Sequence, residues 1–274
     1  EGVKERGAPL CVGIVYPTEM PEDLSLMRLL KQWLQGAGYE VVLGSPFNLQ
    51  ASPEGGVLLL GRQVDVLYRH YKTDWWGERA SVWDDEPPFP DPLPLRRPLE
   101  VVLQAQLAGK VSVLNPFGAV LTQNKRAMAF LHERRERFSP AAQEAIGAVL
   151  PETVRLEVMD PAKLSQERER WVLKSDYGAE GDEVIVGRLV DQKTWDASLL
   201  HAVPGRWVAQ RYFQAELGPG GESVNHGVYL VAGRAAGLYA RVQQGATDSL
   251  ALSAPLWVGA QSQSSGQGVE AVSP

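Results

Sequence analysis

The stretch Trp171–Gly187, WVLKSDYGAEGDEVIVG, decides how the rest of the chain is interpreted. A short apolar strand ends on Lys174, a loop with two glycines follows, and a β-branched strand begins at Val184. A lysine beside such a loop can hold a polyphosphate, because its ammonium is a point charge and glycines let backbone N–H groups approach phosphate oxygens. The alternative is an ordinary β-hairpin whose loop carries lysine and glycine by chance. The rest of the sequence is needed to choose between the two.

Length and composition are those of a globular protein. The 274 residues suffice for one large or two modest domains, and contents of 44% hydrophobic and 22% charged residues are ordinary. The formal net charge of −6 argues against a dominant surface for nucleic acid or membranes, and no apolar run of about 18 residues is present. We therefore expect no nucleic-acid partner, no membrane span and, by default, a cytoplasmic location.

The residue types that usually hold metals or act as nucleophiles form no pattern. Cys11 is the only cysteine and stands in an apolar run, which favours a buried structural thiol and excludes a zinc site of the cysteine type. The four histidines show no metal-ligand spacing, and no Ser/His/Asp or reactive-cysteine arrangement is visible. The sequence therefore leaves any metal ligands unknown.

The first part of the chain alternates between strand and helix patterns. A continuous apolar run at Leu10–Tyr16, a helix that opens at Pro21 and a strand at Tyr39–Leu43 form a βαβ pattern, which predicts a parallel sheet. Six prolines between Asp84 and Pro98 predict an extended surface loop. Further strands are expected at residues 57–60, 64–68 and 111–114, and further helices at residues 99–108, 122–137 and 140–150.

From Trp171 onward strand patterns dominate, which predicts an α+β unit with a mainly antiparallel sheet. One helix interrupts them at about Asp191–Val203. The expected strands cover residues 171–174, 184–187, 207–213, 223–231 and 235–243. We therefore predict an α/β domain at residues 1–110, a second domain at residues 111–258 and a flexible tail rich in Ser, Gln and Gly at residues 259–274.

Four features follow one another in an order that suits nucleotide binding. Asn115–Pro116 precedes a helix with Lys125, then come the Lys174 loop, a strand with Gln210 and a β-hairpin that ends on Arg241. Two lysines from different elements can bracket the α- and β-phosphates, while a strand beside the base can offer main-chain groups to its edge. An arginine at a strand end can neutralise a γ-phosphate or an acyl phosphate.

This order resembles the ATP-grasp fold and, more closely, the glutathionylspermidine synthases and related circularly permuted ATP-grasp proteins. The family shows a segment "N/E-P … sNK", an ATP-binding loop "vlKP..GrEG..V", an adenine-side strand with glutamine and a hairpin "GkaaGl..R". The stretch Val64–Trp76 is also similar to the family's "lyR..p.dW" segment, and the resemblance covers roughly residues 10–258. The counterparts in this chain are Asn115, Pro116, Asn124, Lys125, Lys174, Gly178, Glu180, Gly181, Val184, Gln210, Gly233, Ala235, Ala236, Gly237, Leu238 and Arg241.

The resemblance implies a pre-ATP-grasp parallel α/β domain followed by an ATP-grasp domain with a mainly antiparallel sheet. It implies an ATP-dependent carboxylate–amine ligase that works through an acyl phosphate, with ATP and Mg²⁺ as cofactors and small-molecule or peptide carboxylates and amines as substrates. Arg241 is expected in the catalytic role. The residues expected to bind ATP are Lys125, Lys174, Gly178, Glu180, Gly181 and Gln210.

The chain departs from the family's pattern in three ways. Ser175 follows Lys174 where the family has proline, and Ala179 stands in place of the arginine of "REG". The family's "D…E.N" metal ligands have no counterpart before Leu10. Our expectation is that these Mg²⁺ ligands lie upstream of Glu1, on a missing segment or another chain.

Two other functions stay open. The first is a catalytically silent scaffold of the same fold that binds a nucleotide or a partner, which the missing metal ligands favour and the retained lysines oppose. The second is a sugar-nucleotide transferase, suggested only by the early βαβ pattern. Four residues of the first domain, Arg69, Asp74, Trp75 and Trp76, could face substrate, although the tryptophans are better suited to packing.

Overall fold

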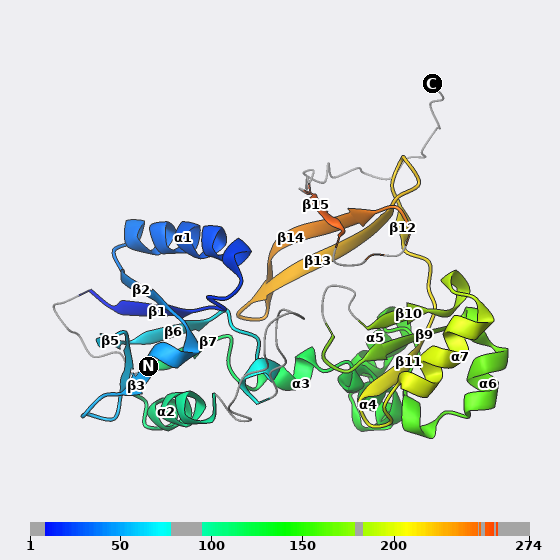
Figure 1. The fold of residues 1–274 in the computed structure, drawn as a ribbon, viewed down its shortest axis with the longest axis horizontal. Coiled ribbons are helices and arrows are strands. Elements are labelled where there is room, and N and C mark those ends of the chain that lie inside the picture. Colours follow the sequence, from blue (N-terminus) through cyan, green and yellow to red (C-terminus); the bar gives the residue numbers. More distant parts are fainter. Residues whose placement is uncertain are drawn as a thin grey trace. The chain divides into compact units, whose positions relative to one another are not determined.

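A computed structural model describes residues 9–77, 95–178, 183–245, 247, 250–254 and 256 of the chain (Figure 1). The chain divides into two compact units, Glu1–Asn124 and Lys125–Pro274. Most of the expected proline-rich loop and all of the expected tail at residues 259–274 lie outside the described residues. Within the described ranges, no helix combines the length and the apolar character that crossing a membrane requires.

The first unit is built on a parallel sheet of the order β2-β1-β6-β7, as the βαβ pattern predicted. Its strands are β1 (Cys11–Val15), β2 (Glu40–Gly44), β6 (Val66–Arg69) and β7 (Ser112–Leu114), and α1 (Pro21–Gly36) connects the first two. Because β7 pairs with β6, the first unit extends past the boundary expected at residue 110 and reaches Asn124.

Helices cover both faces of this sheet, and successive residues of β1 point to opposite faces. Val12 and Ile14 are buried in a cluster with Met27 of α1. Val15 is buried in a second cluster with residues of α2 (Arg96–Leu107). Figure 1 accordingly shows α1 and α2 on opposite sides of the sheet. The unbroken apolar run at the start of the sequence is therefore explained by burial on both sides.

The strand expected at residues 57–60 is present as the middle strand of a small antiparallel sheet, and the sheet itself was not predicted. It consists of β3 (Leu49–Ala51), β4 (Val57–Leu59) and β5 (Arg62–Val64). Leu60 and Gly61 have φ angles of 52° and 76°, so they form the tight turn between β4 and β5. The strand expected at residues 64–68 is in fact the end of β5 and the start of β6. Two short 3-10 helices, η1 and η2, complete the unit at Pro46–Asn48 and Asp74–Trp76.

The second unit contains an antiparallel sheet of the order β10-β9-β11-β8, which confirms the predicted change in architecture. Its strands are β8 (Thr153–Arg155), β9 (Trp171–Ser175), β10 (Val184–Val186) and β11 (Trp207–Arg211). The hairpin expected around Lys174 exists, since β9 and β10 pair directly. Strand β8 was missed because its three residues include only one apolar side chain, whereas the equally short β10 is an unbroken β-branched run.

One face of this sheet packs against α6 (Pro161–Gln166) and α7 (Gln192–His201), as Figure 1 shows. Trp195 of α7 is fully buried, and its indole N–H donates to the carbonyl of Leu164 at 3.1 Å. The opposite face of β9 and β11, which carries Lys174 and Gln210, is not covered by α6 or α7. The buried residues of the packed face include Leu164, Trp171, Leu173, Trp195, Trp207 and Ala209.

The helix expected at residues 122–137 is broken. The structure has α3 (Ala119–Gln123), then Asn124 in an extended conformation with φ −69° and ψ 120°, then α4 (Arg126–Glu133). Lys125 therefore caps α4 instead of lying in its first turn. A third helix, α5 (Pro140–Val149), begins as predicted, with Ser139 accepting a hydrogen bond from the N–H of Ala142. The remaining 3-10 helices are η3 (Arg135–Arg137), η4 (Leu156–Val158), η5 (Arg168–Arg170) and η6 (Gly187–Leu189).

A second antiparallel sheet follows in the second unit. Its strands, in order, are β12 (Glu216–Leu217), β13 (Ser223–Val231), β14 (Arg234–Gln243) and β15 (Leu252–Ala254). Ala232–Gly233 joins β13 to β14, and both residues have a positive φ, which matches the right-handed twist of the hairpin.

Candidate functional site

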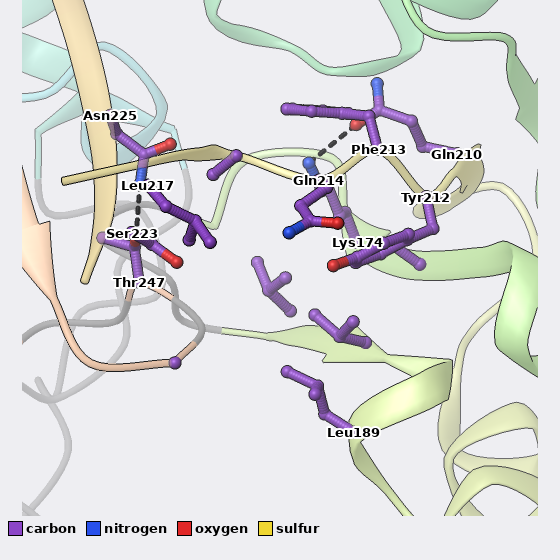
Figure 2. A pocket seen from close by; sticks show the side chains of 15 residues that line it. Lys174, Leu189, Gln210, Tyr212, Phe213, Gln214, Leu217, Ser223, Asn225 and Thr247 are labelled. Carbon is purple, nitrogen blue, oxygen red and sulfur yellow. Dashed lines mark hydrogen bonds between the residues drawn. The ribbon is translucent and has the colours of Figure 1, made fainter. Parts of the chain in front are cut away.

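Lys174 and Gln210 meet on the face of the β9–β11 sheet that α6 and α7 leave uncovered. Lys174 lies opposite Val208, so Gln210 is its diagonal neighbour on the same face. The ammonium of Lys174 donates to Oε1 of Gln210 at 2.7 Å, as Figure 2 shows. Gln210 in turn donates from Nε2 to the hydroxyl of Thr153 at 2.8 Å, which fixes the orientation of the buried amide. The structure thus brings together two residues that the sequence singled out.

The ammonium of Lys174 is placed in a poorly solvated position. Burial lowers the pKa of Lys174, and the charge of Lys125 lowers it further. No carboxylate within the described residues forms an ion pair with it. A partly buried cation without a counter-charge is unfavourable, and an anionic ligand would relieve this.

Lys125 is attached to the loop that follows Lys174. Its main-chain N–H donates to the carbonyl of Asp176 at 2.9 Å, and its ammonium donates to the carbonyl of Gly178. The N–H of Gly178 donates to the hydroxyl of Ser175 at 3.0 Å, which closes the start of the loop. The structure therefore also brings Lys125 and Gly178 to Lys174.

Glu180 and Gly181, the other two predicted residues of this loop, lie outside the described residues. Sequence reasoning missed Asp176 and Arg206. The buried carboxylate of Asp176 accepts from Nε of Arg206 at 3.2 Å, and its other oxygen forms an ion pair with the same atom at 3.0 Å. The N–H of Asp176 donates to the carbonyl of Arg206 at 2.8 Å. The only available signal was an acidic residue soon after the strand lysine, which is common in loops.

A cavity of about 420 Å³ opens beside the Lys174–Gln210 pair (Figure 2). Tyr212 and Phe213 contribute aromatic rings, while Asn225 and Thr247 lie at the side of the second sheet. Lys174 is the only charged side chain among the described residues that line the cavity. The lining thus combines apolar and aromatic surface with one cation and several amides and hydroxyls, which suits a ligand with a planar ring system and negative charge.

Arg241 belongs to the second sheet of this unit. It lies on β14 directly opposite Asn225 of β13, and opposite residues of an antiparallel pair share one face of the sheet. Asn225 lines the cavity, whereas Arg241 is not among its described lining residues. The structure therefore places Arg241 on the sheet that borders the cavity, outside the described lining.

The donor set fits a polyphosphate better than a metal ion. Lys125 and Lys174 offer ammonium groups, and Gln210 holds one of them in place. In the described part of the chain, no three His, Cys, Asp or Glu side chains gather where a metal ion could be held. We therefore assign no residue to Mg²⁺.

The candidate substrate residues of the first unit serve its own packing. Arg69 is 4% exposed and donates from Nε to the carbonyl of Asn115 at 2.8 Å. Asp74 accepts a hydrogen bond from an amide side chain of α3 at 2.8 Å. Trp76 is buried in the core of the unit, and Trp75 packs against that core. A role for these four residues in facing substrate stays a prediction.

Comparison with known proteins gives no match at the level of families. No family model matches the chain, and no curated protein matches it. Similarity is found among solved structures. The ATP-grasp ligase PsnB, complexed with a minimal precursor, has a TM-score of 0.52 at 13% identity, over 89% of this chain and 75% of that chain.

Two other solved structures have lower scores. The D-cycloserine synthetase DcsG has a TM-score of 0.47 at 13% identity, over 84% of this chain and 67% of that chain. A RimK domain ATP-grasp protein from Sphaerobacter thermophilus has a TM-score of 0.43 at 20% identity, over 75% of this chain. The matched part spans 65% of the length of the Sphaerobacter structure. The likeness to PsnB shows the fold of this chain, which is an ATP-grasp fold.

Proposed function

We propose that the chain is an ATP-dependent ligase that joins a carboxylate to an amine. The observation that carries the proposal is the ammonium of Lys174, which is partly buried and held by Gln210 at the edge of a cavity. Among the described residues, it has no carboxylate as an ion-pair partner, and no other charged side chain lines the cavity. Lys125 adds a second ammonium at the same loop. One cation that lines the cavity and a second on the adjoining loop support the binding of a di- or triphosphate.

In this proposal the residues of the chain act by position and charge. Lys125 and Lys174 would hold the phosphates, and Tyr212 and Phe213 would border the base. When bound, ATP would supply the phosphoryl group that activates a carboxylate as an acyl phosphate. Arg241, on the face of the sheet that borders the cavity, is proposed to neutralise the transferred phosphate. No side chain has to act as a nucleophile, which agrees with the sequence.

The specific resemblance to glutathionylspermidine synthases stays part of the proposal. It suggests small-molecule or peptide carboxylates and amines as substrates, and Mg²⁺ as the metal that accompanies ATP. Glu180 and Gly181 are proposed as further residues of the phosphate loop.

The test is carboxylate-dependent formation of ADP. The full chain is incubated with ATP, Mg²⁺, hydroxylamine as a general amine, and a panel of amino-acid and short-peptide carboxylates. The proposal predicts ADP release together with a hydroxamate for at least one carboxylate. Both products should be lost in Lys174→Met and retained in the control Lys163→Met, which removes an exposed lysine of α6.

Two other outcomes contradict the proposal. Binding of ATP without ADP release for any carboxylate would indicate the catalytically silent scaffold. Equal activity of Lys174→Met and the unaltered chain would remove Lys174 from the site.

A further inference from the structure

The segment Ser175–Gly178 fixes both lysines of the candidate site. Lys174 directly precedes the segment. Lys125 is bound to it twice, through its N–H on the carbonyl of Asp176 at 2.9 Å and through its ammonium on the carbonyl of Gly178. A change in the shape of this segment would therefore move both ammonium groups relative to each other.

Asp176 ties this segment to the residue before β11, just beyond the end of β9. It is 5% exposed, and its two carboxylate oxygens lie 3.0 and 3.2 Å from Nε of Arg206. Its main-chain N–H donates to the carbonyl of the same arginine at 2.8 Å. Arg206 directly precedes β11, the strand that carries Gln210. Asp176 thus links α4, through Lys125, to the strand whose glutamine holds Lys174.

We propose that Asp176 is a positioning residue of the nucleotide site, and that it sets the spacing of the Lys125 and Lys174 ammonium groups for a phosphate chain. The inference rests on the proposed binding of ATP. Asp176 need not touch the nucleotide, because its effect passes through the main chain of Lys125 and through the loop that follows Lys174.

The direction in which ATP affinity changes on removal of the Asp176 charge tests the inference. A carboxylate near a site for an anion weakens anion binding by Coulomb repulsion. If charge were the whole effect, Asp176→Asn would bind ATP more tightly than the unaltered chain. If Asp176 acts by positioning, the same substitution weakens the charge-assisted bond to Arg206, loosens the segment and weakens ATP binding.

The experiment compares ligands with and without phosphates. Binding of ATP, ADP and adenosine to the full chain is measured by calorimetry for the unaltered protein and for Asp176→Asn. The matched control is Glu133→Gln, which removes the same charge from α4 and breaks an ion pair with Arg155 at 2.7 Å. We expect ATP and ADP to bind about tenfold more weakly to Asp176→Asn. Adenosine binding should be unchanged, and Glu133→Gln should match the unaltered chain.

The comparison of ATP with adenosine separates a loss of phosphate positioning from a general distortion of the fold. An equal loss for adenosine would indicate a distorted fold and overturn the inference, as would ATP affinity that is unchanged or increased. Arg206→Gln provides a second variant in case Asp176→Asn does not fold, because the side chain of Arg206 is 45% exposed. It should show the same selective loss for ATP and ADP, and unaltered binding would overturn the inference. If the unaltered chain binds no ATP, the proposed function fails first, and the inference falls with it.

Discussion

Glu157 forms an ion pair with Arg126, which lies in the first turn of α4. Substitution of Glu157 tests how strongly this pair attaches α4 to the rest of the second unit. Arg126 donates to the two carboxylate oxygens at 3.0 and 2.5 Å. These hydrogen bonds lower the pKa of Glu157 from 4.5 to about 2. Such a difference corresponds to roughly 3 kcal/mol of stability. The two side chains are 21% and 28% exposed, so screening by water and salt reduces the expected contribution to about 1–2 kcal/mol.

The sign of the pH dependence follows from the lowered pKa. The stabilisation by Glu157 is complete above its unfolded-state pKa of about 4.5 and is lost as the pH falls towards 2. We expect Glu157→Gln to lower the free energy of unfolding by about 1–2 kcal/mol at pH 7. The difference from the unaltered chain should shrink between pH 4.5 and pH 2.

Urea unfolding measures this difference, followed by the fluorescence of the buried tryptophans of the second unit, Trp171, Trp195 and Trp207. The control is Glu136→Gln, which breaks an exposed ion pair with Arg137 in the same unit and should cost less than about 0.5 kcal/mol. A Glu157→Gln variant as stable as the unaltered chain at pH 7 would refute the reasoning. So would a destabilisation that stays constant down to pH 3.

Three further predictions concern single residues. Gln210→Leu removes the acceptor of the Lys174 ammonium, so the pKa of Lys174 should fall further. ATP affinity measured by calorimetry should then drop more at pH 9 than at pH 7, and an equal loss at both pH values would contradict this. Trp195→Ala should destabilise the second unit by about 3–5 kcal/mol in urea, whereas the exposed control Leu200→Ala should have little effect; similar losses for both would speak against the assigned core. Arg69→Met removes the hydrogen bonds of the guanidinium to the carbonyls of Asn115 and Tyr71 and should lower the stability of the first unit by about 2–4 kcal/mol, measured by amide hydrogen exchange in β6; unchanged protection would contradict the assigned role.

The architecture could be predicted because the burial of a strand or helix determines which of its positions are apolar. The unbroken apolar run at Leu10–Tyr16 indicated a strand covered on both faces, and β1 is such a strand. The change to strand-rich sequence after Trp171 indicated the antiparallel sheet. Strands β3 and β8 were missed, although β4 and β10 are equally short and were predicted. The difference lies in composition, because β4 and β10 are unbroken apolar runs, whereas β3 and β8 contain polar side chains.

The site was predictable in its residue types but not in its contacts. Lys174 and Gln210 stood out in the sequence, yet their hydrogen bond depends on the register of β9 against β11, which local patterns do not encode. Lys125 was expected inside a helix. It caps α4 instead, because its N–H binds the carbonyl of Asp176 far along the chain. That contact is fixed by tertiary structure alone.

The central claim is that the ammonium of Lys174 binds a nucleotide phosphate. The most direct measurement is a calorimetric titration of ATP, with Mg²⁺ supplied, into the full chain and into Lys174→Met, with Lys163→Met as the control. The account predicts saturable binding to the unaltered chain and to the control, and affinity at least about tenfold lower for Lys174→Met. Absence of ATP binding to the unaltered chain, or equal affinity for Lys174→Met, would contradict it.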